Sequence, residues 1–172
     1  MFSRTGRLVS GLATVALALG LTVSAPAAPT PVPGGANQIG ALSGKVGQTL
    51  FNGILRVTVQ TVHDATADDH PEKDLPGADQ KIIVMNVLIK NGWHDTFGYL
   101  MEYTLADADS VTKQIGQPYI HPASLGIEQG AAARQIVRVP VDKTFRPVKL
   151  LIECGGCPDN MHFRALRITI PQ

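Results

Sequence analysis

The chain has 172 residues, of which 44% are hydrophobic and 17% are charged, and its formal net charge is +1. Two of its 15 basic residues and none of its 14 acidic residues fall in the first 27 positions, so the rest of the chain carries a net charge of −1. That balance gives no electrostatic basis for binding nucleic acid or anionic lipid. Residues 39–172 are a normal length for one domain with a full hydrophobic core.

The first 27 residues have the layout of a secretory signal peptide. Arg4 and Arg7 precede a short apolar run over residues 8–23, and Ala25-Pro26-Ala27 is an A-x-A cleavage signal. An uncleaved membrane anchor is the alternative, but the apolar run is short for one. We therefore predict a secreted or periplasmic protein with no stable membrane insertion after cleavage. Residues 28–38 are rich in proline and glycine and are expected to form an extended spacer.

Beyond the spacer, apolar and polar residues alternate in short runs separated by turn residues, a pattern typical of β-strands. The run over 81–91 is apolar on both faces for most of its length, which predicts a central strand covered on both sides. The Asn52-Gly53 dipeptide indicates a tight turn. The other clear runs are 55–61, 135–140, 148–153 and 164–170, and weaker runs are 45–51, 98–107 and 111–117.

Strands at this spacing without crossover helices predict an all-β fold, an antiparallel immunoglobulin-like β-sandwich of seven or eight strands. The disulfide and packed tryptophan of antibody domains are absent, so the predicted likeness is one of architecture. The predicted core consists of the inward residues of the alternating runs, namely Leu55, Val57, Val59, Met85, Val87, Ile89, Leu105, Val137, Val139, Val148, Leu150, Ile152, Leu166, Ile168 and Ile170.

The order of these segments resembles a known family. GKVGQTL (44–50), ILRVTVQTV (54–62) and KIIVMNVLIKNG (81–92) are followed by YTLADADSVTKQ (103–114) and LGIEQGAAARQIVRVPVD (125–142). Together they resemble exported bacterial immunoglobulin-like domains of unknown function, a family that includes a secreted mycobacterial immunogenic antigen. The resemblance covers about residues 44–152. It implies no catalytic residues, because the family has none that are agreed, and the segment Cys154–Cys157 lies outside its pattern.

Both cysteines of the chain lie in the segment IECGGCPDN, as Cys154 and Cys157. We predict a disulfide that closes a turn between the last two strands, because two intervening residues keep the Cα atoms within disulfide range. A structural zinc site would need about four ligands, and His162 is the one further candidate nearby. A thiol-redox site would need an α/β context that the strand pattern does not provide.

Two further clusters could bind a ligand. The acidic loop over 63–74 could hold a divalent metal through His63, Asp68, Asp69 and His70, and the alternative is a solvated loop. Arg134, Arg138 and Lys149 are expected on one outward sheet face, where they could dock an acidic partner or a polyanion. The alternative there is a solvated face that prevents edge pairing.

No nucleophile motif such as G-x-S-x-G occurs in the chain. We therefore expect an exported, non-catalytic binding or interaction module without a cofactor, whose partner is an envelope or extracellular protein or polymer. A metal-binding periplasmic protein that uses the His63–His70 loop is the first alternative. A thiol-redox protein that uses Cys154 and Cys157 is the second.

Overall fold

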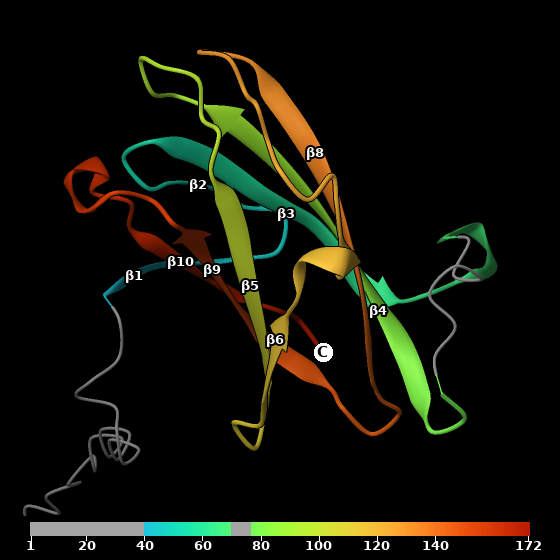
Figure 1. Cartoon of the computed structure of the whole chain (residues 1–172). Helices are drawn as coiled ribbons and strands as arrows, with labels where there is room; N and C mark the ends of the chain where they lie inside the picture. The colour runs from blue at the N-terminus through green and yellow to red at the C-terminus, as the bar shows by residue number, and fades with distance from the viewer. Residues whose placement is uncertain (1–39, 70–76) are drawn as a thin grey trace, which may run out of the picture. The chain divides into compact units, whose positions relative to one another are not determined.

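The computed structural model describes residues 40–69 and 77–172, which form two five-stranded sheets packed face to face (Figure 1). One sheet has the order β1-β10-β9-β5-β6 and the other β2-β3-β4-β8-β7. The strands are β1 (Ala41–Lys45), β2 (Thr49–Phe51), β3 (Leu55–Asp64), β4 (Gln80–Asn91), β5 (Leu100–Asp107), β6 (Thr112–Ile115), β7 (Ile120–His121), β8 (Ala132–Asp142), β9 (Pro147–Gly155) and β10 (Ala165–Thr169). The predicted signal peptide and spacer lie outside the described residues.

The predicted antiparallel β-sandwich is confirmed, with ten strands in place of seven or eight. The run expected as one strand over 45–51 is divided between β1 and β2, which belong to different sheets. Gly47, with a positive φ of 85°, lies in the turn that divides them. One pairing departs from the antiparallel rule, because β1 runs parallel to β10. Within the described residues, no helix is long and apolar enough to cross a membrane.

Alternate residues of the strands face the space between the sheets, as the sequence pattern predicts. Leu55, Val57 and Val59 of β3 are fully buried there. On β4 the outward-facing Ile82 and Val84 are buried as well, which confirms that this central strand is covered on both sides over part of its length. Of the predicted core, only Val148 is partly exposed.

A polar bridge crosses this apolar core. The Tyr103 hydroxyl of β5 donates to Gln135 Oε1 of β8 at 2.5 Å, and Gln135 Nε2 donates to the Pro122 carbonyl at 2.8 Å. Both side chains are fully buried, and burial raises the pKa of the Tyr103 phenol well above its ordinary value. The bridge therefore joins the two sheets through neutral groups that have no access to water.

We predict that Tyr103→Phe lowers the free energy of unfolding by about 1–3 kcal/mol, because it leaves Gln135 Oε1 buried without a donor. Urea unfolding followed by circular dichroism measures the loss. Tyr119→Phe is the matched control, since Tyr119 is only partly buried against the edge of the core and should change stability by less than about 0.5 kcal/mol. Equal losses in the two variants would contradict a role for the bridge.

Candidate functional site

A cleft of about 640 Å³ opens at the end of the sandwich that carries the disulfide. Three segments line it, the β2–β3 turn, the β4–β5 loop and the β9–β10 loop. Ile54 and Met161, both nearly buried, contribute apolar surface. Around them lie the aromatic and polar side chains Trp93, His94, Tyr99, Asn160 and His162. A concave, partly apolar surface with a few converging polar groups is the usual form of a ligand-binding site.

The buried side chain of Asn91 holds the β4–β5 loop in place. Its Nδ2 donates to the carbonyls of Asp95 at 2.6 Å and Ile127 at 2.8 Å, and its Oδ1 accepts from the Trp93 N–H at 2.8 Å. Phe97 is fully buried and pairs with Ile127 in an isolated bridge. These contacts fix the loop against the β7–β8 loop and so determine where its aromatic side chains lie.

Ring contacts further order the aromatic side chains of this loop. Trp93 and His94 meet edge to face with centroids 4.9 Å apart, and Phe97 and Tyr99 do so at 5.6 Å. Such contacts are favourable beyond the area that they bury. The imidazole of His94 lies 3.0 Å from Asp95 Oδ2 in an exposed pair. This side of the cleft is therefore formed by rings that pack against one another, and His94 at its edge is exposed to solvent.

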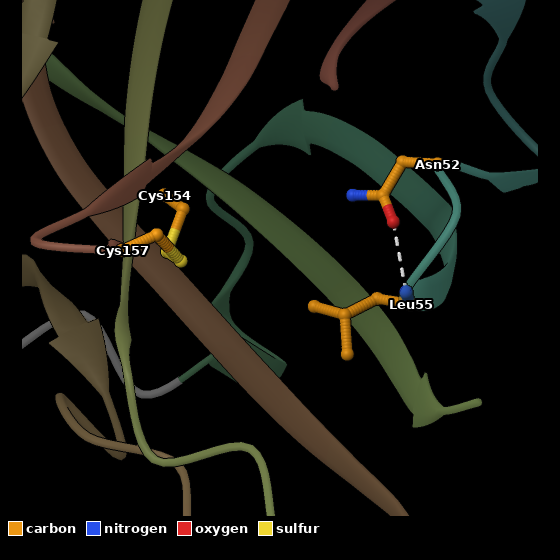
Figure 2. Close-up of a disulfide and its surroundings, with 4 residues drawn as sticks. All are labelled: Asn52, Leu55, Cys154 and Cys157. Atoms are coloured by element: carbon orange, nitrogen blue, oxygen red, sulfur yellow. Dashed lines mark hydrogen bonds between the residues drawn. A yellow bond between two sulfur atoms is a disulfide. The ribbon is translucent and has the colours of Figure 1, made fainter. Parts of the chain in front are cut away.

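The β2–β3 turn, predicted from Asn52-Gly53, is held in a similar way. Asn52 is buried, and its Oδ1 accepts from the Ile54 N–H at 3.0 Å. The same oxygen accepts from the Leu55 N–H at 2.8 Å (Figure 2). Gly53 has a positive φ of 102°, which a residue with a side chain rarely adopts. The turn thus presents Gly53 and Ile54 to the cleft.

The predicted disulfide between Cys154 and Cys157 is present, with Cα atoms 5.6 Å apart (Figure 2). It closes the turn at the end of β9, a strand that includes Cys154, and the chain continues through a 3₁₀ turn, Asp159–Met161, before β10 begins. The loop between the last two strands is therefore longer than the pinned hairpin tip that the sequence suggested. The cysteines precede this short turn and not an α-helix, the setting that typically lowers a redox thiol's pKa.

Two glycines lie inside this disulfide ring. A Cβ at Gly155 would lie 2.6 Å from Oε1 of Glu102, the end of an exposed and flexible side chain that would have to shift. Gly156 follows with a positive φ of 75°. The two glycines therefore allow the chain to turn against β5, and a second hollow of about 330 Å³ forms beside the disulfide, lined in part by Glu153, Asp159 and His162.

The acidic loop forms local contacts in place of a cluster of ligands. Asp69 accepts from the N–H and the hydroxyl of Thr66, both at 2.8 Å, and lies 3.2 Å from His63 Nε2. The Thr66 N–H is the main reason that the pKa of Asp69 lies below its ordinary value, and the Thr66 hydroxyl and His63 add to the effect. The contact from the Thr66 N–H to Asp69 is the acid half of a capping box, while the Asp69 N–H donates to the Thr66 carbonyl at 3.2 Å. The T-x-x-D spacing is the signal for it in the sequence.

The structure brings together two of the four residues predicted to bind a metal, His63 and Asp69. Asp68 is exposed beside them, and His70 lies outside the described residues. Within residues 40–69 and 77–172, no three histidine, cysteine or acidic side chains form a group that could hold a metal ion. The four-residue metal site stays a prediction.

The expectation that Arg134, Arg138 and Lys149 share one sheet face is wrong for Lys149. Arg134 and Arg138 point outward from β8, whereas Lys149 lies on β9 of the other sheet. Alternation along a strand fixes the side on which a residue lies, but it does not determine the sheet to which the strand belongs. Arg138 Nε also donates to the Asp69 carbonyl at 3.2 Å, so this cation is already engaged.

Sequence reasoning did not find the cleft. Trp93, His94, Asn160 and Met161 fall between the predicted runs, Tyr99 falls in the weak run 98–107, and His162 was considered only as a possible zinc ligand beside the cysteines. The one available signal was a second Asn-Gly dipeptide, Asn91-Gly92, at the end of the most apolar strand. Only the folded loops bring these side chains together.

No family model matches the chain, and a search of curated proteins found no match. Among solved structures, the chain is similar to a conserved hypothetical protein from Bacillus anthracis, at 15% identity over 71% of this chain and 94% of that one, with a TM-score of 0.45. It is also similar to an uncharacterised β-sandwich protein from Clostridium difficile, at 11% identity over 77% and 95%, with a TM-score of 0.36. A β-glucosidase from Erythrobacter marinus aligns at 12% identity over 68% of this chain and 16% of the enzyme, with a TM-score of 0.32. None of these likenesses extends to function, and the resemblance to exported immunoglobulin-like domains stays a prediction.

We predict that Asp69→Ala lowers the free energy of unfolding by about 1 kcal/mol at neutral pH, because it removes the capping box. Because the pKa of Asp69 is lowered in the folded protein, the stabilisation that its carboxylate provides is complete above the ordinary pKa of 3.8. That stabilisation is lost as the pH falls through the lower pKa of the folded state. The difference between variant and parent should therefore shrink in acid, as urea unfolding across pH can show. Asp68→Ala is the control and should be neutral. A pH-independent difference for Asp69→Ala would rule out this account.

We predict that the double variant Cys154→Ser/Cys157→Ser loses about 2 kcal/mol of stability or less, because the disulfide closes a very small ring. Thermal unfolding measures the loss, and the intact mass of the parent should rise by two hydrogens on reduction. Loss of all folded structure in the variant would show that the disulfide does more than close the turn.

Proposed function

We propose that the protein is an exported, non-catalytic binding module that holds its ligand in the cleft at the disulfide end. The observation that carries this proposal is the convergence of Trp93, His94, Tyr99 and His162, from two separate loops, on one cleft. Its volume of about 640 Å³ falls within the range of small-molecule sites. A rigid scaffold that presents its binding groups on loops is a common arrangement among sandwich folds.

The lining of the cleft indicates the kind of ligand. Among its described residues there is no lysine, arginine, aspartate or glutamate, while aromatic rings supply flat apolar surface. Imidazole and amide groups on His94, His162 and Asn160 offer hydrogen bonds without a fixed charge. This combination favours a neutral ligand that has an apolar face and several hydrogen-bonding groups.

Two features support export. The first 27 residues have the layout of a signal peptide. The Cys154–Cys157 disulfide is compatible with an oxidising compartment outside the cytoplasm.

The closed turn also limits the freedom of the β9–β10 loop, which lowers the entropy that this loop loses on binding.

We predict that binding changes the fluorescence of Trp93, because it is the one tryptophan of the chain and it lines the cleft. Uncharged oligosaccharides and end-blocked apolar peptides are suitable probes for titration. His162→Ala should weaken the binding of an active probe by about tenfold, as expected for a contact in a hot spot. The control His121→Ala removes an exposed histidine on β7 and should have no effect. Unaltered affinity of His162→Ala, or no saturable signal from any probe, would contradict the proposal.

A further inference from the structure

One end of the outer face of the sheet β2-β3-β4-β8-β7 carries positive charge without negative charge among the described residues. Arg56 on β3 faces Lys90 on β4 in register, and Lys90 lies diagonal to Arg134 on β8. The outward positions around these three residues include no aspartate or glutamate, and Asp142, the exposed last residue of β8, lies opposite Gln80 at the far end of β4. We call the surface formed by Phe51, Thr58, Arg56, Leu88, Lys90 and Arg134 the basic face.

The other sheet provides a contrast. Its outward positions combine the cations Lys149 and Arg167 with the acids Glu102 and Glu153, and the two glutamates are paired in register. Charges of both signs are the ordinary state of a solvated sheet surface. The basic face is therefore a property of one end of this sheet and does not follow from the near-neutral composition of the chain.

The cations of the basic face are available to a partner. Lys90 and Arg134 are exposed, and neither forms an ion pair or side-chain hydrogen bond with any part of the chain that the structure describes. Arg56 is held in place, with its guanidinium 4.7 Å above the centre of the exposed Phe51 ring and close against Gly92. Cations left without acids repel one another, and a bound anion relieves that repulsion.

The spacing of the charges indicates an extended anion. Arg56 and Lys90 are direct neighbours across two strands, about 5 Å apart at Cβ, and the diagonal from Lys90 to Arg134 is about 7–8 Å. The three charges thus follow an oblique line over three strands. A polymer with one acidic group on each repeating unit would match such a line better than a single compact anion would.

Hydroxyl and amide groups lie beside this line. Thr58 and Thr49 share a hydrogen bond of 2.7 Å between their hydroxyls, and Asn86 Nδ2 donates to Thr61 Oγ1 at 2.8 Å. Such groups can exchange hydrogen bonds with a chain that carries hydroxyls as well as charge. Single-stranded nucleic acid is bound largely by stacking of its bases on aromatic rings, and the exposed aromatic ring here, Phe51, is already covered by Arg56.

We infer that the basic face binds a linear anionic polysaccharide along the line from Arg56 through Lys90 to Arg134. This surface adjoins the cleft but shares no described residue with it, so the inference does not depend on the proposed function. Contacts of this kind are mainly electrostatic, and their affinity falls as salt concentration rises.

The experiment measures the affinity of the purified full chain for heparin oligosaccharides and for polyuronate at low and at physiological salt, by calorimetry. The double reversal Lys90→Glu/Arg134→Glu should weaken binding by about tenfold or more and should make it less sensitive to salt. The matched control is Lys45→Glu/Lys149→Glu, which makes the same change in net charge with exposed lysines of the other sheet. Its affinity should stay much closer to that of the parent.

Three outcomes would overturn the inference. The first is absence of measurable binding of both glycans at low salt. The second is an equal loss of affinity in the two double variants, which would show that net charge and not the basic face controls binding. The third is tighter binding of duplex DNA or of an acidic protein than of either glycan, with the same sensitivity to Lys90→Glu/Arg134→Glu, which would assign the face to another partner. Circular dichroism of each variant confirms that it is folded.

Discussion

The arrangement of the loops around the cleft depends on the hydrogen bonds that one buried side-chain amide, that of Asn91, requires. Asn91 is fully shielded from water at the end of the central strand β4, so each of its polar atoms must find a partner in the protein. Backbone groups of two loops supply those partners, and the loops are thereby tied to each other and to β4. The position of Trp93 in the cleft wall follows directly, because its own N–H is one of the groups used.

Two surfaces of different character result from this construction. The cleft is built from packed rings and short, hydrogen-bonded turns, so a ligand would meet groups that are already in place. The basic face relies on the long side chains of Lys90 and Arg134, which keep their freedom until an anion orders them. A protein with both surfaces could hold a neutral ligand firmly in the cleft while its basic face binds an anionic polymer more weakly.

The sequence predicted most of the strands because alternation is a local property and the sandwich buries one side of nearly every strand. It did not predict β7, which has two residues, or the break between β1 and β2, where two short strands of different sheets follow each other. Lys149 was assigned to the wrong face for a related reason, since periodicity gives the orientation of a residue but not the partners of its strand. The disulfide was predictable because the distance between its Cα atoms is set by two intervening residues.

The cleft could not be predicted in the same way. Trp93 and His162 are far apart in the chain and lie in loops, where no period marks the residues that will converge. What the sequence did contain was the two Asn-Gly dipeptides, and in both the asparagine is a buried acceptor that organises a turn. An asparagine at the end of a strongly apolar strand is thus a sign of an ordered loop as well as of a turn.

The parallel pairing of β1 with β10 has a consequence for how the domain folds. The strand that begins the domain finds its partner in the last strand, across nearly the whole length of the sequence. Such a contact closes a very long loop and therefore forms late, after the local hairpins have assembled. The sheet β1-β10-β9-β5-β6 cannot be completed until the final strand is available.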